Sequence, residues 1–366
     1  MYHPSVLPFC EDFATIPDST LIVLSCDSAR KEWSHLKNQL PAGLPAGELH
    51  LYDPQSPTTL PLKLTVPVAD FRPLGISAVR LPDGRARLFV ANQAFAGATV
   101  EVVDVELTTG ATTHAATVAD ALIQSPNGIA AVSPTGFFVT NDLYFARKSL
   151  PAALLEVVLG IAGGTLVHVE LTAALAPKNA TRVARIAFAN GVVADPATRR
   201  LWVAGMLSGV YEYVWDGADA AALTTVDFAR SAMLADNLVF SEATGGVYVS
   251  GVASVKALGP AFADPDAARH PSLTAELLPR LVKGDVGIDA ARRGADIANK
   301  ALRTEEWRWA TVFADSGSVF SGATSGAVLQ NGRFVATGLL SRGVVVCKEA
   351  PGRPALKAPV AEKSEL

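Results

Sequence analysis

The chain has 366 residues, and its 31 basic and 35 acidic side chains give a net charge of −4. That balance provides no basic patch, so nucleic-acid binding is not expected. Apolar residues make up 49% of the sequence and charged residues 18%, which supplies a large core and excludes a disordered chain. Length alone favours about two domains.

A short apolar strand that ends in a small or polar residue recurs along the chain. The copies are residues 21–26, 88–92, 137–141, 201–205, 247–251 and 334–338. Most follow a turn signal, and most stand between two further apolar segments, as 88–92 stands between 75–79 and 100–105. This pattern is typical of the meander of a propeller blade. Six copies predict an all-β fold in which residues 1–350 form a single six-bladed β-propeller, despite the length.

Two insertions interrupt the repeat. Residues 150–161 have helical spacing, which predicts a helix that packs on the propeller rim, forms a lid or contacts a membrane surface. Residues 265–304 also carry Ala, Leu and Arg at helical density. The apolar stretch 150–169 is too short, and too interrupted by Glu156 and glycines, for a membrane span. Residues 351–366 are expected to be a C-terminal tail.

Oxygen-bearing side chains stand just before the innermost strands of the expected blades, where the strand starts converge on the central channel. They are Glu11, Asn127, Asn190, Asp236 and Asn237. Because no cysteine or histidine joins them, the set disfavours zinc and favours a hard cation. Calcium tolerates such a mixed shell of carboxylates and amides better than magnesium does. The sequence therefore predicts one calcium ion in the channel.

The motifs Pro126-Asn-Gly-Ile, Thr140-Asn-Asp, Phe188-Ala-Asn-Gly and Ala235-Asp-Asn-Leu resemble those of the paraoxonase (arylesterase/lactonase) family. That family is kin to the strictosidine-synthase-like and gluconolactonase propellers. The resemblance implies a six-bladed propeller whose catalytic calcium is held by the same five residues, with Asp142 beside them. It also implies a second, structural calcium at Asp12 and the Ile76 carbonyl. That ion is disfavoured because its expected Asn-Asp partner is Asn127-Gly128 here.

Histidines that the resemblance leads one to expect are replaced. The catalytic histidine of the family falls at Leu74, its partner at Gln93, and two others at Leu143 and near Val252. None of the six histidines lies in a site motif. The channel wall would then include Leu74, Gln93, Leu143 and Phe188, which suits a small hydrophobic substrate.

Three functions stay open on these residues. The first is a calcium-dependent lactonase or esterase in which a metal-bound aspartate, Asp236, replaces the histidine base, with Asp142 as a further catalytic candidate. The second is a non-hydrolytic cyclase of secondary metabolism that uses calcium and the shape of the cavity. The third is a catalytically inactive binding propeller.

The chain ends are expected to close one blade together, with residues 343–347 pairing with N-terminal sequence. Position favours a disulfide between Cys10 and Cys347, although sequence does not fix connectivity. A glycosylation sequon at Asn179, and a C-terminus that differs by one residue from an ER-retention tetrapeptide, favour the secretory pathway, either the ER lumen or secretion. The start of the chain shows no leader, so we expect one to have been lost.

Overall fold

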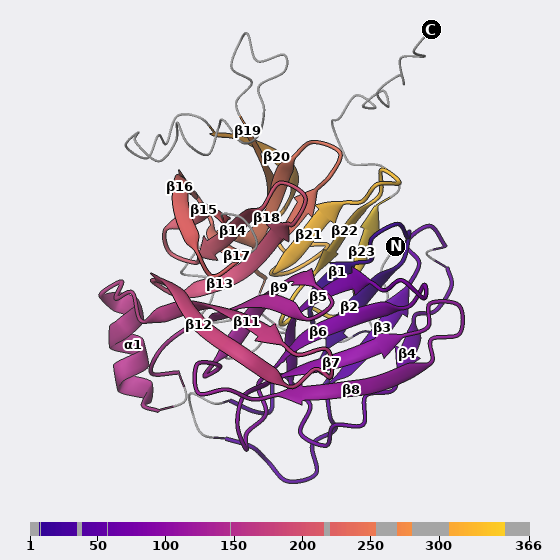
Figure 1. Ribbon diagram of the computed structural model, residues 1–366. Helices are drawn as coiled ribbons and strands as arrows, with labels where there is room; N and C mark the ends of the chain where they lie inside the picture. The colour runs from indigo at the N-terminus through magenta and orange to yellow at the C-terminus, as the bar shows by residue number, and fades with distance from the viewer. Residues whose placement is uncertain are drawn as a thin grey trace, which may run out of the picture.

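The computed structural model describes residues 7, 9–34, 39–56, 58–146, 148–215, 220–253, 269–279 and 307–347. Its strands form five four-stranded sheets and one three-stranded sheet, which are the six blades of a β-propeller (Figure 1). Within each sheet the strands follow one another in chain order, so every blade is an antiparallel meander. The expected all-β, six-bladed fold is confirmed.

The first three blades contain the N-terminal half of the chain. Blade one comprises β1 (Cys10–Thr15), β2 (Ile22–Cys26), β3 (Glu48–Tyr52) and β4 (Leu62–Leu64). Blade two comprises β5 (Pro73–Arg80), β6 (Ala86–Asn92), β7 (Thr99–Val105) and β8 (Thr112–Val118). Blade three comprises β9 (Pro126–Ser133), β10 (Gly136–Asn141), β11 (Gly164–Leu171) and β12 (Pro177–Ile186).

The remaining blades follow in chain order. Blade four comprises β13 (Ala189–Asp195), β14 (Arg200–Gly205), β15 (Gly209–Trp215) and β16 (Leu223–Arg230). Blade five comprises β17 (Leu234–Ser241), β18 (Gly246–Val252), β19 (Ser272–Pro279) and β20 (Trp307–Asp315). Blade six comprises β21 (Ser325–Val328), β22 (Phe334–Thr337) and β23 (Val345–Cys347).

The six strands found by their repeat are all second strands of blades. Strand β6 shows why they are so apolar, since Leu88, Phe89 and Val90 on successive positions are all fully buried. Blades stack face to face, so a strand in the middle of a blade is covered on both faces and gains from apolar residues at every position. The first strand of each blade contacts the first strands of its two neighbours, so these strands form a closed ring around the axis.

The two chain ends meet, as expected. The Phe9 amide donates to the Ser341 carbonyl at 2.8 Å, and the Gly343 amide donates to the Leu7 carbonyl at 2.9 Å. Figure 1 accordingly shows β1 next to the strands of blade six. The disulfide expected between Cys10 and Cys347 is wrong. Cys10 is bonded to Cys26, because β1 and β2 are antiparallel neighbours and place these residues opposite each other, and Cys347 is a free thiol.

The first insertion contains the helix α1 (Leu150–Val158), which lies at the edge of the propeller (Figure 1). The Ser149 side chain caps its first turn by accepting from the Ala152 amide, and Ala153 and Glu156 are buried while Leu154 is 55% exposed. The rim position is therefore confirmed. In the part of the chain that the structure describes, no helix has the length and apolar character needed to cross a membrane.

In the second insertion, residues 265–304, the part that the structure describes is residues 269–279, and this part is not the helix that the composition predicts. It contains strand β19, in which the side chains of Thr274, Ala275, Glu276 and Leu277 are all buried. Ala, Leu and Glu favour helices on their own, but the strand pairs on both sides with β18 and β20, and this tertiary pairing overrides the local preference. Residues 280–304 and the expected tail lie outside the described residues.

Candidate functional site

The five residues expected around the channel all lie on the first strands of their blades, near the start of each strand. We call the end of the channel where the first strands begin the narrow end. Glu11 lies on β1, Asn127 on β9, Asn190 on β13, and Asp236 and Asn237 on β17. All five are buried, with exposures between 2% and 9%. The structure therefore brings the predicted metal-site residues together on the ring of inner strands.

Strand pairing is interrupted at these same residues. The register between first and second strands shifts between Cys10 and Asp12 and between Ala189 and Val192, and similar shifts flank Asn127 and the Asp236-Asn237 pair. Such a bulge frees a residue from regular alternation and re-aims its side chain. The local irregularity therefore explains how consecutive residues Asp236 and Asn237 both serve the ring.

Glycines set the width of the narrow end. A methyl group on Gly75 would stand 2.3 Å from the Asn127 carbonyl oxygen, and one on Gly128 would stand 2.9 Å from the Asn190 carbonyl oxygen. Gly191 is packed in the same way, since its methyl would stand 2.6 Å from the Asn237 Cα. From β5 to β17, each inner strand thus touches the backbone of the next one, and a side chain at these three positions would force the strands apart.

Hydrogen bonds hold the ring side chains but leave several oxygens unused. Asn237 Nδ2 donates to Glu11 Oε1 at 2.7 Å, and the Asn190 side chain hydrogen-bonds Asp236. The unused atoms are Glu11 Oε2, Asn127 Oδ1, Asn190 Oδ1 and Asn237 Oδ1, each buried without a hydrogen-bond partner in the described structure. A buried polar atom without a partner costs about 1–3 kcal/mol. Four of them in one ring, all oxygens, form a donor set of the type that hard cations take.

The carboxyl groups of the ring repel one another. Burial raises the pKa of Glu11 well above its ordinary value, and the nearby Asp12 and Asp236 raise it further. Burial, with the charge of Asp12, raises the pKa of Asp236 to about 7. Packing several carboxylates into a buried space is unfavourable unless a cation compensates their charge.

Asp12, which was expected to hold a second ion with Ile76, does lie against Ile76. Its Oδ2 accepts from the Ile76 amide at 3.2 Å, and its Oδ1 accepts from the Phe13 amide at 2.8 Å and from the Ser325 hydroxyl. Burial nevertheless raises the pKa of Asp12 to about 6. Its carboxylate oxygens are engaged by protein donors, whereas the ring around Asn127 keeps unused oxygens.

Asp142 stands beside the ring. Hydrogen bonds from Ser125 and Asn127 reach its side chain, and its Oδ1 accepts from the Leu143 amide at 2.6 Å. Burial outweighs these bonds and raises the pKa of Asp142 to about 6. Leu143 and Phe188 belong to a small apolar cluster with Ala153 of α1, so the helix and the wall residues are packed together.

The two positions where the resemblance expects a histidine pair are filled differently. Leu74 is 6% exposed and belongs to a large apolar cluster that includes Ile129, separate from the cluster of Leu143 and Phe188. Gln93 Nε2 donates to the Pro126 carbonyl at 3.1 Å, which places this amide next to Asn127. Gln93 therefore lies next to the oxygen ring, whereas the Leu74 side chain has no polar atom that could act as a base.

The described histidines have other surroundings. His50 pairs with Glu48 and His114 with Glu101, while the ring of His168 packs on Phe138. His270 is buried in the loop before β19, with neither ring nitrogen hydrogen-bonded in the described structure. His3 and His35 lie outside the described residues.

Sequence reasoning missed the contribution of blade six to the ring. The Thr324 hydroxyl donates to the Glu11 carbonyl at 2.6 Å, the Thr324 carbonyl accepts from the Asn237 amide at 3.0 Å, and Ser325 donates to Asp12. The polar run just before β21 carried the same signal as the other strand starts and would have led to these two residues.

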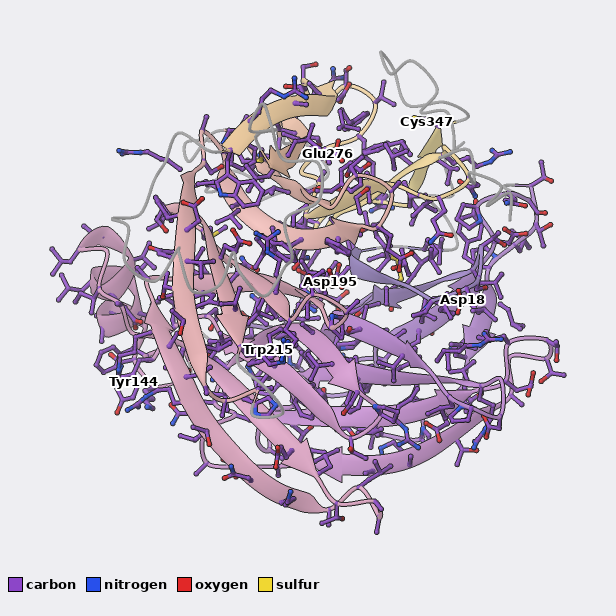
Figure 2. The ribbon with its side chains drawn as sticks, turned by 45° about the horizontal axis from the view of Figure 1, so that its top comes forward. Asp18, Tyr144, Asp195, Trp215, Glu276 and Cys347 are labelled. Atoms are coloured by element: carbon purple, nitrogen blue, oxygen red, sulfur yellow. A yellow bond between two sulfur atoms is a disulfide. The ribbon has the colours of Figure 1, made fainter. Side chains whose placement is uncertain are left out.

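The opposite end of the channel, where the first strands finish, is the wide end. It holds a cavity of about 1120 Å³, which reaches inward to Asp12 and Asn237. Its walls include Ile129, Val192 and Leu238, and the charged residues that line it are Asp12, Asp195 and Glu242. Figure 2 shows Asp195 near the middle of the molecule and Tyr144 at its edge beside α1.

These features define a six-bladed propeller with a buried oxygen ring at one end of its axis. The chain belongs to the arylesterase family, whose model matches residues 44–263 and so includes four of the five predicted metal-site residues, all but Glu11.

Curated relatives agree with that family. The chain is 30% identical to serum paraoxonase/arylesterase 2 of Gallus gallus over 207 residues, 55% of this chain and 56% of the relative. It is 30% identical to serum paraoxonase/arylesterase 2 of Homo sapiens over 184 residues, 50% and 49% of the two chains. It is 27% identical to serum paraoxonase/lactonase 3 of Oryctolagus cuniculus over 268 residues, 73% and 66%. The chain thus spans about half the length of the first relatives it matches.

Proposed function

We propose that this protein is a calcium-dependent hydrolase of lactones or aryl esters that works at the narrow end of its channel. The observation that carries the proposal is a set of four buried side-chain oxygens that have no hydrogen-bond partner in the described structure. The ring in which they lie contains two carboxyl-bearing residues, Glu11 and Asp236. The names of the relatives, which include arylesterase and lactonase, support the reaction class. A bound calcium ion would act as a Lewis acid toward a substrate carbonyl.

The side chains around the ring would have three further roles: binding the cation, accepting a proton from water and orienting the substrate. Glu11 and Asp236 supply the negative charge that a divalent cation needs, and the amides of Asn127, Asn190 and Asn237 supply neutral oxygens. Asp142, next to Asn127, and Asp236 are the carboxylates positioned to take a proton from water. Leu143 and Phe188 provide an apolar wall that orients the hydrophobic part of a small substrate.

A second candidate, a non-hydrolytic cyclase, is favoured by one specific contact. Gln93 uses its amide to hold the Pro126 carbonyl, and Leu74 is buried among apolar residues, so neither position offers a base for water. Cyclisation needs an oriented substrate and a polarised oxygen but no activated water. The third function, a propeller that binds a hydrophobic ligand without turnover, would use the same apolar wall of Leu143 and Phe188.

The test combines metal binding with turnover of phenyl acetate and δ-valerolactone. Wild-type protein in calcium should hydrolyse at least one substrate, and a chelator should remove the activity and lower the melting temperature. Asp236→Ala should bind no calcium and show no activity. Asp142→Asn should keep the ion and lose about 10²–10⁴-fold in kcat. Asp195→Asn, at the other end of the channel, is the matched control and should resemble wild type.

Each alternative gives a distinct result. Calcium bound at the ring with no turnover of either substrate would reject the hydrolase and leave the cyclase or binding propeller. Absence of calcium binding, measured by calorimetry on chelator-treated protein, would reject the metal site itself.

A further inference from the structure

Arg30 lies at the narrow end, in a position that no part of the proposed function uses. It belongs to the turn that follows β2, closed by a hydrogen bond from its own amide to the Asp27 carbonyl at 3.0 Å. Because Cys10 of β1 and Cys26 of β2 stand opposite each other, this turn begins beside Glu11. The Asp27 amide also donates to the Phe9 carbonyl at 3.1 Å, which fixes the turn to the start of β1.

The Arg30 guanidinium is held from two sides. Its Nη2 donates to the Pro73 carbonyl at 2.8 Å, and its central carbon lies 4.4 Å from the centre of the Trp33 ring. Pro73 directly precedes Leu74, the position where the resemblance expects a catalytic histidine. The charge of Arg30 is also close enough to Glu11 to lower the pKa of that carboxyl. A fixed cation therefore stands between the oxygen ring and the altered histidine position.

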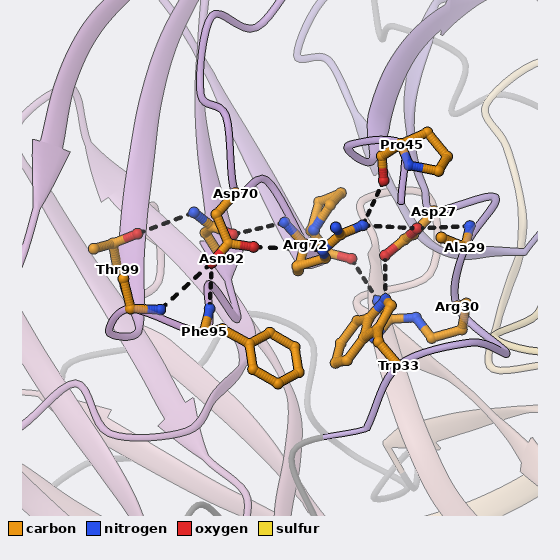
Figure 3. Close-up of polar contacts among 12 residues, drawn as sticks. Asp27, Ala29, Arg30, Trp33, Pro45, Asp70, Arg72, Asn92, Phe95 and Thr99 are labelled. Atoms are coloured by element: carbon orange, nitrogen blue, oxygen red, sulfur yellow. Dashed lines mark hydrogen bonds and ion pairs between the residues drawn. The ribbon is translucent and has the colours of Figure 1, made fainter. Parts of the chain in front are cut away.

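Arg72, the neighbouring arginine, shows what a purely structural arginine looks like here. It is 3% exposed, its Nη1 donates to the Pro45 carbonyl at 2.6 Å, and its guanidinium lies 3.6 Å from Asp27 and 3.5 Å from Asp70 (Figure 3). Arg30, in contrast, is only partly buried. The Nε atoms of both arginines lack a hydrogen-bond partner in the described structure, but that of Arg72 lies 3.5 Å from the Asp70 carboxylate.

In the described structure, the hydrogen bonds of the Asp27 carboxylate go to groups other than the Arg30 guanidinium. Its Oδ1 accepts from the Ala29 amide at 2.9 Å and faces Arg72, and its Oδ2 accepts from the Trp33 indole at 2.8 Å (Figure 3). The same indole is the surface on which Arg30 lies. The network therefore orients the Arg30 guanidinium and leaves it donor capacity for another anion.

We propose that Arg30 binds a carboxylate on the substrate, so that the preferred substrates are lactones or esters that also carry a free carboxylate. A guanidinium that is stacked and already oriented loses little freedom on pairing with a carboxylate, and charge-assisted hydrogen bonds of this kind are strong. The Arg30 side chain is partly exposed to solvent, so a ligand anion can reach it. The turnover part of this inference rests on the proposed hydrolase, whereas the binding part does not.

The kinetic test uses two probes that differ in one charge, 4-acetoxybenzoate and its methyl ester. Wild type should show a KM about 10- to 100-fold lower for the carboxylate, with similar kcat values, as expected for one charge-assisted contact. Arg30→Gln should remove that preference by raising only the KM of the anion, and Arg30→Lys should retain part of it. Arg85→Gln, an exposed arginine paired with Asp83, is the matched control and should keep it. Equal KM values for the two probes in wild type would overturn the proposal.

A binding measurement separates this inference from the proposed function. Calorimetric titration of benzoate into calcium-loaded wild type should detect binding that weakens at least 10-fold in Arg30→Gln, even if neither probe is hydrolysed. Benzoate binding that is absent from wild type, or equal in wild type and Arg30→Gln, would reject the carboxylate site. A change in calcium affinity alone would show that Arg30 only balances the charge of Glu11. The melting temperatures of Arg30→Gln, Arg30→Lys and Arg85→Gln verify that the three variants are folded.

Discussion

The two ends of the central channel are built from the same ring of first strands but have opposite character. At the narrow end, residues such as Asn127 and Asn190 sit on interrupted strand pairing, glycines bring the backbones into contact, and buried oxygens lack partners. At the wide end, the first strands present apolar side chains such as Ile129 and Leu238 to a cavity of about 1120 Å³.

The difference shows how a propeller separates stability from chemistry. Apolar side chains line the wide end, where a cavity remains. The costs concentrate at the narrow end, where carboxyl pKa values are raised and polar atoms are unsatisfied. Functional sites commonly carry such unfavourable features, which the surrounding fold stabilises. Four changes test whether the two ends differ in this way.

Gly75→Ala should have the largest effect on stability. Its methyl group would stand 2.3 Å from the Asn127 carbonyl oxygen and 2.7 Å from the Gly128 Cα, so rigid backbone rather than a flexible side chain must move. We expect a loss of about 3 kcal/mol in the free energy of unfolding, together with weaker calcium binding. Denaturant titration measures the first and calorimetry the second.

Gly97→Ala is the control for that change, because its methyl group would meet nothing within 4 Å. It should change the free energy of unfolding by less than about 0.5 kcal/mol. Equal effects of the two substitutions would show that the narrow end is not tightly packed.

Cys10→Ser should have an effect of similar size, because the disulfide to Cys26 ties the two strands that carry Glu11 and lead to Arg30. The bond closes a loop with a sequence separation of 16, for which about 3 kcal/mol of stabilisation is expected. Cys347→Ser should cost much less, since this thiol is free. A thiol count of one on denatured, unreduced protein checks the pairing, and a count of three would contradict it.

The sequence predicted the ring but not everything that surrounds it. Residues such as Asn190 and Asp236 were recognisable because a polar residue before an apolar strand has a fixed place in a propeller. The pairing of Cys10 with Cys26 was missed because it depends on the register between two strands. The strand nature of residues 272–279 was hidden by helix-favouring side chains. Arg30 carried no signal, since its place beside Pro73 depends on the turn folding across two blades.

The stabilisation expected from the proposed calcium ion should depend on pH, with a smaller effect than the substitutions above. In the folded, metal-free protein the pKa values of Asp236 and Asp12 are raised to about 7 and about 6. An unfolded aspartate titrates near about 4. Between these values these two groups hold more protons in the folded state, so their contribution to metal-free stability is greatest below about pH 4 and falls as pH rises toward 7.

Calcium needs the ionised carboxylates, so its effect should be large at pH 8 and small at pH 5. We expect the difference in unfolding free energy between calcium-loaded and chelated protein to shrink by roughly 2 kcal/mol over this range. Thermal unfolding at both pH values, with and without chelator, measures it. A calcium effect that grows as pH falls would contradict the role of these carboxyl groups.

Val193→Ala, at the wide end, should have the smallest effect. Val193 lines the cavity and is only partly buried, so removing two methyl groups enlarges a space that already exists. We expect a loss of about 1 kcal/mol, from the transfer of partly buried methyl groups alone, and unchanged calcium affinity. Val203→Ala is the matched control, because Val203 is fully buried between blades and its truncation creates a new cavity that should cost about 3 kcal/mol. If both substitutions cost the same, the wide end is as closely packed as the core, and the contrast between the two ends of the channel fails.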